Sequence, residues 1–196
     1  DALLALVASQ EPALVRASAL ELLTRYPGQS ALEAFARGTR DPDGLVRHAA
    51  LGGLEGLTGE QRLPFVGPLL SDPLRAVRSQ AARLLFELPA EALGPFAPAF
   101  EQARDEYEAI QRGLLERPES RLNLAQLLAS TARAPEAGEE LRAALRLEPR
   151  FTPARVNLAE LARSTAGESE VEGTLRDGLG RGLDDMSVAV VHYGDV

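Results

Sequence analysis

Residues 72–85, Asp-Pro-Leu-Arg-Ala-Val-Arg-Ser-Gln-Ala-Ala-Arg-Leu-Leu, decide the fold because their pattern recurs along the chain. Apolar or small residues return four, seven and eight positions after the valine, which is the spacing of one face of a helix. The valine-arginine pair has a constant step of 31 residues, at Val15-Arg16, Val46-Arg47 and Val77-Arg78. Fixed periods of this length are typical of helical solenoids, so the sequence predicts an all-α fold built as a right-handed α-α superhelix.

An acidic residue followed by proline stands shortly before each of these valines. Its carboxylate can accept hydrogen bonds from the free amides at a helix start, and proline suits the first helical position. We therefore predict that a second helix begins at each of three turns, Glu11-Pro12, Asp41-Pro42 and Asp72-Pro73. The first helices of the second and third repeats have starts that match the spacing of a capping box, Ser30 with Glu33 and Thr58 with Gln61.

A second period appears later in the chain. Asn123-Leu124-Ala125 returns as Asn157-Leu158-Ala159 after 34 residues. Between the two arrays, residues 95–116 carry an apolar stripe spaced by three and four, which predicts one long helix. The predicted organisation is three short repeats over residues 1–88, a long linking helix over 89–117, two repeats over 118–183, and a truncated third repeat or cap over 184–196.

Composition argues against several classes of function. The formal net charge is −8 and no half of the chain is basic, so we expect neither nucleic acid nor an anionic lipid surface as a partner. No apolar run approaches the roughly 20 residues that cross a bilayer, so no membrane span is expected. Cysteine is absent, which excludes disulfides, thiolate metal sites and cysteine nucleophiles.

Candidate catalytic and metal-binding residues are few. His48 follows Val46 by two positions, which turns it about 200° from the core face of its helix and predicts a solvated imidazole. A haem or metal ligand is the weaker alternative, because neither His48 nor His192 has a cysteine or a second histidine nearby. Acidic clusters such as Asp105-Glu106-Glu108 have the spacing of a solvated helix face. We expect no catalytic residue, no cofactor and no metal.

Three glycines, Gly52, Gly53 and Gly56, fall where the second helix of the middle repeat is expected. Each costs a helix interior about 1 kcal/mol relative to alanine. Close approach of a neighbouring helix over Gly53 is the favoured explanation, and a hinge or a contact with a ligand is the alternative.

The repeated acidic-proline, valine-arginine pattern over residues 1 to about 88 resembles the HEAT repeat in its short form. In HEAT arrays the equivalent aspartate and arginine bond between neighbouring repeats. The resemblance thus implies a structural ladder between repeats formed by Arg16, Asp41, Arg47, Asp72 and Arg78. The alternative is a row of arginines that grips an anionic ligand, but a charge that recurs at the repeat period is normally structural.

From Pro118 onward the chain resembles the tetratricopeptide repeat, whose packing positions are matched by Leu124, Ala125, Leu128, Ala137, Leu141, Ala144 and Pro149. The second copy keeps Leu158, Ala159, Ala162 and Leu175. Arg121 and Arg155 stand at the family's usual tryptophan position. The resemblance implies a groove lined by the first helices, which we expect to bind a protein or peptide through Gln126, Ser130, Glu160, Arg163 and Ser164.

The end of the chain is apolar. Residues 186–191 run Met-Ser-Val-Ala-Val-Val, and terminal repeats normally need a polar outer face. We expect Val188 and Val190 to contact a partner there, with a homo-oligomer formed through this C-terminal edge as one outcome.

The order of the parts, a short-HEAT array followed by tetratricopeptide-like repeats, resembles the haem-free C-terminal region of bacterial secreted multihaem c-type cytochromes. This resemblance implies a periplasmic or extracellular setting and a non-catalytic role as an interaction or assembly arm. The alternative comes from repeat type alone, because short HEAT repeats also resemble those of the lyases that attach bilins to phycobiliproteins. That alternative would make the chain an enzyme or an accessory subunit.

Overall fold

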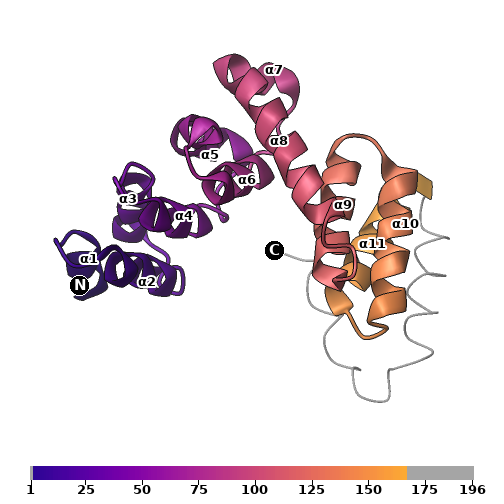
Figure 1. Cartoon of the computed structure of the whole chain (residues 1–196), viewed down its shortest axis with the longest axis horizontal. Helices are drawn as coiled ribbons and strands as arrows, with labels where there is room; N and C mark the ends of the chain where they lie inside the picture. Colours follow the sequence, from indigo (N-terminus) through magenta and orange to yellow (C-terminus); the bar gives the residue numbers. More distant parts are fainter. Residues whose placement is uncertain (1, 167–196) are drawn as a thin grey trace. The chain divides into compact units, whose positions relative to one another are not determined.

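The computed structural model describes residues 2–166, and throughout this part of the chain the regular structure is helical, with no strand. The prediction of an all-α repeat solenoid is confirmed. The chain divides into two compact units, residues 1–109 and 110–196 (Figure 1). The predicted cap at 184–196, with Val188 and Val190, lies outside the described residues.

The first unit begins with three helix pairs, each of which is one repeat (Figure 1). In each pair the second helix carries the valine-arginine motif. The pairs are α1 (Ala2–Val7) with α2 (Ala13–Leu23), α3 (Gln29–Gly38) with α4 (Gly44–Gly52), and α5 (Gly59–Val66), continued by the 3-10 helix η1 (Gly67–Ser71), with α6 (Arg75–Arg83).

The predicted core face is buried in the second and third repeats. Val46 and Val77 are inaccessible, as are Leu54 and Leu85 at the ends of their stripes. The first repeat departs from the prediction, because Leu22 is 45% exposed. Among the described elements α2 packs on α1, α3 and α4, which leaves one flank of the helix, with Leu22, open.

The turns between paired helices differ in detail from the prediction. Asp41 and Asp72 do accept backbone amides, from Asp43 at 2.9 Å and Leu74 at 2.8 Å. Each of these bonds closes a turn in which the amide lies two residues after the aspartate. Pro42 and Pro73 therefore lie before the helix and are not its first residues. The capping box at Thr58 is present, whereas Ser30 lies inside α3, which has Gly28 at its N-cap.

Only Gly52 lies in the helix, as its last residue, so the prediction that all three glycines lie inside it was wrong for Gly53 and Gly56. Helix α4 stops at Gly52, Gly53 is its C-cap, and Gly56 lies in the following turn. The close approach over Gly53 is confirmed, since a Cβ built there would lie 2.2 Å from the ring of Phe35. Gly53 therefore lets α3 pack directly on the end of α4.

Residues 89–112 form a short helix followed by a long one: α7 (Ala90–Leu93), the 3-10 helix η2 (Gly94–Phe96) and α8 (Ala97–Arg112). Gly94 sits at the break with φ of 51°, a conformation that favours glycine. Phe100, Ala103 and Tyr107 are buried along one side of α8. Tyr107 meets the ring of Phe86 edge to face, with centroids 5.2 Å apart.

The second unit contains α9 (Pro118–Ser130), α10 (Ala134–Leu147) and α11 (Thr152–Ala166) within the described residues. α10 packs against both of the others. Seven of the residues expected to pack form its core, together with Ala154, which was not predicted: Leu124, Ala125, Leu128, Ala137, Leu141, Ala144 and Leu158. Pro149 is exposed, and Leu175 of the second copy lies outside the described part.

Candidate partner-binding surfaces

The arginines of the repeated motif reach the aspartates of the next repeat. Arg16 Nη2 donates to Asp41 Oδ1 at 2.8 Å. Arg47 binds Asp72 twice, from Nε to Oδ2 at 2.6 Å and from Nη2 to Oδ1 at 3.0 Å. Each pair spans 25 residues and joins the second helix of one repeat to the turn that precedes the second helix of the next.

The guanidinium groups of Arg47 and Arg78 also donate hydrogen bonds to the turn that precedes their own helix. Arg47 Nη1 donates to the carbonyl oxygens of Asp41 and Pro42, at 2.8 and 2.9 Å. Arg78 Nη1 makes the same two bonds to Asp72 and Pro73, at 2.7 and 3.1 Å. These bonds occupy most of the donors of Arg47, which leaves little of its guanidinium to bind an anionic ligand.

The third arginine has a partner that sequence reasoning missed. Arg78 donates to Glu106 of α8, from Nε at 2.9 Å and from Nη2 at 3.0 Å. The prediction that Glu106 belongs to a solvated acidic cluster was wrong, because its side chain is only 24% exposed. No acidic-proline pair stands 31 residues after Asp72-Pro73, and that absence was the available signal for a carboxylate from another element.

Burial and charge oppose each other at Asp72. Burial alone would raise the pKa of its carboxyl, but the hydrogen bonds from Arg47 and from the Leu74 amide outweigh it and hold that pKa below the usual value. The hydrogen bond to Asp72 raises the pKa of Arg47, against the effect of burial. The pair is therefore ionised at neutral pH.

The five residues predicted to line a groove in the second unit are all exposed. Gln126 and Ser130 lie on α9, and Glu160, Arg163 and Ser164 lie on α11. Gln126 Nε2 donates to Asn157 Oδ1 at 3.4 Å, so the exposed faces of α9 and α11 adjoin. Both serine hydroxyls donate to carbonyls of their own helix at 2.8 Å.

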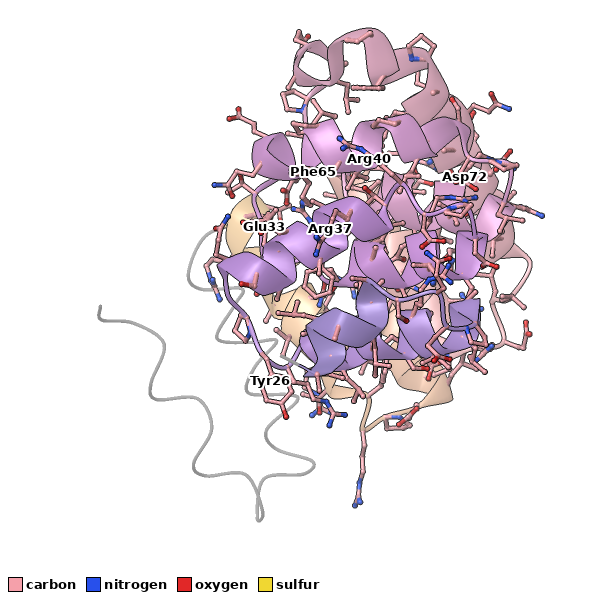
Figure 2. The ribbon with its side chains drawn as sticks, turned by 90° about the vertical axis from the view of Figure 1, so that its left-hand side faces the viewer. Tyr26, Glu33, Arg37, Arg40, Phe65 and Asp72 are labelled. Carbon is pink, nitrogen blue, oxygen red and sulfur yellow. The ribbon has the colours of Figure 1, made fainter. Side chains whose placement is uncertain are left out.

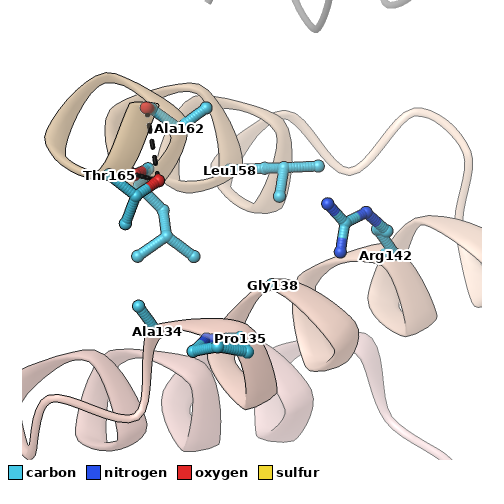
Figure 3. A pocket seen from close by; sticks show the side chains of 8 residues that line it. Ala134, Pro135, Gly138, Arg142, Leu158, Ala162 and Thr165 are labelled. Atoms are coloured by element: carbon cyan, nitrogen blue, oxygen red, sulfur yellow. Dashed lines mark hydrogen bonds between the residues drawn. The ribbon is translucent and has the colours of Figure 1, made fainter. Parts of the chain in front are cut away.

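A small open pocket of about 190 Å³ lies between α10 and α11 (Figure 3). Ala134, Pro135 and Gly138 face Leu158 and Ala162 across it, with Arg142 at its edge. None of the five predicted groove residues lines this pocket.

A larger hollow, of about 570 Å³, lies in the first unit beside the end of α4. Apolar side chains and glycines make up most of its lining: Leu23, Leu32, Phe35 and Leu57, with Gly28, Gly52, Gly53 and Gly56. A neighbouring hollow of about 480 Å³ shares Leu23, Gly28, Gln29 and Ala31 with it. Tyr26, which stands clear of the ribbon in Figure 2, lines this second hollow.

Sequence reasoning did not predict the hollow. Its only trace in the sequence was the glycine cluster, for which a contact with a ligand was the weaker alternative. Two glycines of that cluster, Gly52 and Gly56, line the hollow and meet no atom where a Cβ would stand.

His48 is exposed, as predicted. Over residues 2–166 no group of three histidine, aspartate or glutamate side chains is placed to hold a metal ion. In the same residues no helix combines the length and the apolar character needed to cross a membrane.

Comparison with known proteins supports the first of the two repeat resemblances. A search of the curated proteins found no significant match. Residues 1–86 match the family of HEAT repeats, which are typically non-enzymatic scaffolds that mediate protein–protein interactions. The matched residues cover the three helix pairs α1 to α6 and the ladder arginines Arg16, Arg47 and Arg78. Residues 1–86 of this chain are thus similar to HEAT repeats.

Proposed function

We propose that this chain is a non-catalytic scaffold that binds other proteins. One observation carries the proposal: the charges that recur at the repeat period are engaged between repeats, while the surface keeps open apolar hollows and exposed large apolar side chains. Leu14, Tyr26, Leu45 and Leu74 are each at least 46% exposed on the HEAT array. Exposed apolar surface of this kind is what a protein partner covers.

The second unit, taken by itself, offers a polar surface. Gln126, Glu160 and Arg163 present an amide, a carboxylate and a guanidinium on α9 and α11. Such a mixed surface suits a peptide or protein bound with modest electrostatic selectivity. We assign to it the role of a second contact for the same partner or for another.

Photocrosslinking tests the proposal. A benzophenone amino acid is placed at Tyr26 in one variant and at Gln126 in another, and a matched control carries it at Arg150, an exposed residue in the turn between α10 and α11. We expect a discrete crosslinked protein from the source organism at the first two positions and not at the third. The captured protein, once purified, should bind the unmodified chain with saturation in calorimetry. Equal crosslinking at all three positions, or no saturable complex, would refute the scaffold role.

Self-association through the C-terminal edge is a finer part of the proposal and rests on the sequence of residues 186–191. Each methylene buried there would contribute about 0.8 kcal/mol. Sedimentation velocity of the intact chain and of the Val188→Asp, Val190→Asp variant, over a range of concentrations, should show association in the first alone. If the intact chain and the variant were both monomeric at all concentrations, self-association through the C-terminal edge would be rejected.

The extracytoplasmic setting and the role as an arm of a multihaem cytochrome rest on sequence resemblance, as does the bilin-lyase alternative. Fractionation of cells of the source organism, with an antibody against this chain, tests the location. Recovery of the chain with cytoplasmic markers would count against the cytochrome arm. If the purified chain attached a bilin to a phycobiliprotein subunit, the scaffold role would be rejected in favour of the enzyme.

A further inference from the structure

The 570 Å³ hollow exists at one junction between repeats and is filled at the next. Two of its lining positions, Ala31 and Gly56, correspond at the 31-residue step to Arg62 and Glu87. There the two side chains form an ion pair, with Arg62 only 7% exposed. A Cβ at Gly59, the equivalent of Gly28, would lie 2.8 Å from Glu87 and Leu88. The second junction is therefore closed by side chains that the first one lacks.

Glycine keeps the first junction open without any structural need for it. A Cβ at Gly28, Gly52 or Gly56 would meet no atom within 4 Å. None of the three has a φ in the left-handed range between about +20° and +160°, so other residues could adopt their backbone conformations. Gly53 is different, because the ring of Phe35 occupies the space beside it. The first three glycines leave room that residues 2–166 do not fill.

The side chains that line the hollow indicate which kind of ligand it can bind. The walls are Leu23, Leu32, Phe35 and Leu57, and the described lining has a single charged group, the carboxylate of Glu55 at the rim. Glu55 pairs with Arg83, yet 51% of its side chain is exposed, and a carboxylate can accept more bonds than this pair uses. The chain as a whole carries a net charge of −8. Apolar surface beside negative charge is complementary to an apolar group beside positive charge.

We propose that this hollow, with the adjoining one at Tyr26, is the docking groove for an extended segment of a partner protein. The segment places one leucine- or phenylalanine-sized side chain in each hollow and a lysine or arginine against Glu55. The inference rests on the proposed function, because it names the site and the chemistry of the partner. A hollow of this volume, open and mostly apolar with one charged group in its lining, has the character of a binding site.

The probes are three fluorescent peptides of twelve residues that share a phenylalanine and a leucine and differ in the flanking residues, which are lysine, serine or glutamate. Binding to the full chain is followed by anisotropy. The lysine peptide should bind about tenfold more tightly than the glutamate peptide, and the difference should shrink at about 1 M salt, where charges are screened over roughly 3 Å. Phenethylamine, a small apolar cation, serves as a fourth probe.

Filling the hollow gives the decisive variant. The double substitution Ala31→Arg, Gly56→Glu copies the ion pair of the next junction into this one. The matched control, Arg62→Ala with Glu87→Gly, opens the next junction and leaves the first unchanged. We expect the filled variant to lose about tenfold or more in affinity for the lysine peptide and the control to retain it. Gly56→Leu, which projects a side chain into open space, is the second filling variant if the double one does not fold.

Three results would overturn the groove: unchanged affinity in a folded, filled variant, equal affinity for the lysine and glutamate peptides, or phenethylamine binding as tightly as the lysine peptide. The last would make the site one for small molecules. Photocrosslinking separates these results from a failure of the scaffold role. If the filled variant captured the partner equally well, the scaffold role would be kept and the groove would be rejected. If the peptide bound but no partner was captured, the groove would be kept and the scaffold role would be rejected.

Discussion

Arg47 binds the carboxylate of Asp72 through two nitrogens, Nε at 2.6 Å and Nη2 at 3.0 Å. Its third nitrogen donates to two carbonyls of the turn before its own helix. One side chain thus joins two successive turns of the solenoid. The side chains of Arg47 and Asp72 are only 12% and 3% exposed, so water cannot easily replace the bonds if one partner is removed.

Replacing Arg47 by alanine should lower the free energy of unfolding by about 1.5 to 3 kcal/mol, the range for hydrogen bonds to charged groups. His48→Ala changes the next residue, an exposed one, and should stay within about 0.5 kcal/mol of the parent chain. Urea denaturation of both variants makes the comparison. Equal stabilities would contradict the ladder.

The Arg47–Asp72 pair also predicts how stability depends on pH. The folded state holds the pKa of Asp72 below its usual value of 3.8, so the carboxylate favours folding above that pH. This contribution is lost as pH falls from about 4 through the lower folded pKa. The stability difference between the parent chain and Asp72→Asn should therefore narrow in that window. A difference that stays constant down to pH 2 would mean that the charge of Asp72 does not contribute.

The solenoid was predictable because its cause is local and repeated. Val46 and Val77 fall on buried faces by periodicity alone, and three copies of one pattern reinforce one another. Helix ends were harder, since Asp41 and Asp72 stabilise turns that lie just outside the helix. The sequence shows that a carboxylate is present and does not show which amide it accepts.

The sites depend on contacts between residues far apart, and those left weaker traces. Glu106 lies 28 residues from Arg78 on a helix outside the repeat, so no period points to it. The hollow is defined by missing side chains at Gly52 and Gly56, and the sequence cannot tell an empty position from one that a neighbour fills. Only the packed structure distinguishes Gly56, with open space, from Gly53, which Phe35 covers.

That distinction gives a paired prediction. Gly56→Ala should stabilise the chain by about 0.4 to 1 kcal/mol, because alanine restricts the unfolded chain and its Cβ meets no atom. Gly53→Ala should destabilise it by about 1 to 3 kcal/mol, because its Cβ would overlap the ring of Phe35. Thermal melts of the two variants should move in opposite directions. A shift of both in the same direction would show that the end of α4 is packed differently.

A second pair can be tested in the second unit. Arg121 Nη1 donates to Glu140 Oε2 at 2.7 Å between α9 and α10, and both side chains are about four-fifths buried, at 22% and 19% exposure. We expect a coupling of about 0.5 to 3 kcal/mol in a double-mutant cycle with Arg121→Met and Glu140→Gln. Arg133→Met with Glu136→Gln, a more exposed pair three residues apart at the start of α10, is the control and should couple by less than about 0.5 kcal/mol. Equal coupling energies in the two cycles would contradict a stabilising role for Arg121.

Tyr107 is buried, and its hydroxyl group makes no hydrogen bond to the described residues. Its side chain packs against Phe86 and is 4% exposed. A buried polar group without a partner costs about 1 to 3 kcal/mol. Tyr107→Phe keeps the ring and removes that group, so the variant should be more stable at neutral pH by about 1 kcal/mol.

The same variant should change the alkaline limit of stability. Burial raises the pKa of Tyr107 to about 12, against a smaller opposing effect of the positive charge on Arg83. Because the unfolded phenol ionises near pH 10, the parent chain should lose roughly 1.4 kcal/mol per pH unit between pH 10 and 12, and this loss should be absent in Tyr107→Phe. Urea denaturation at pH 9, 10 and 11 measures it, with Tyr26→Phe, at an exposed tyrosine, as the control. If the parent chain and Tyr107→Phe lost stability in parallel, the buried phenol would not be the group that limits folding at high pH.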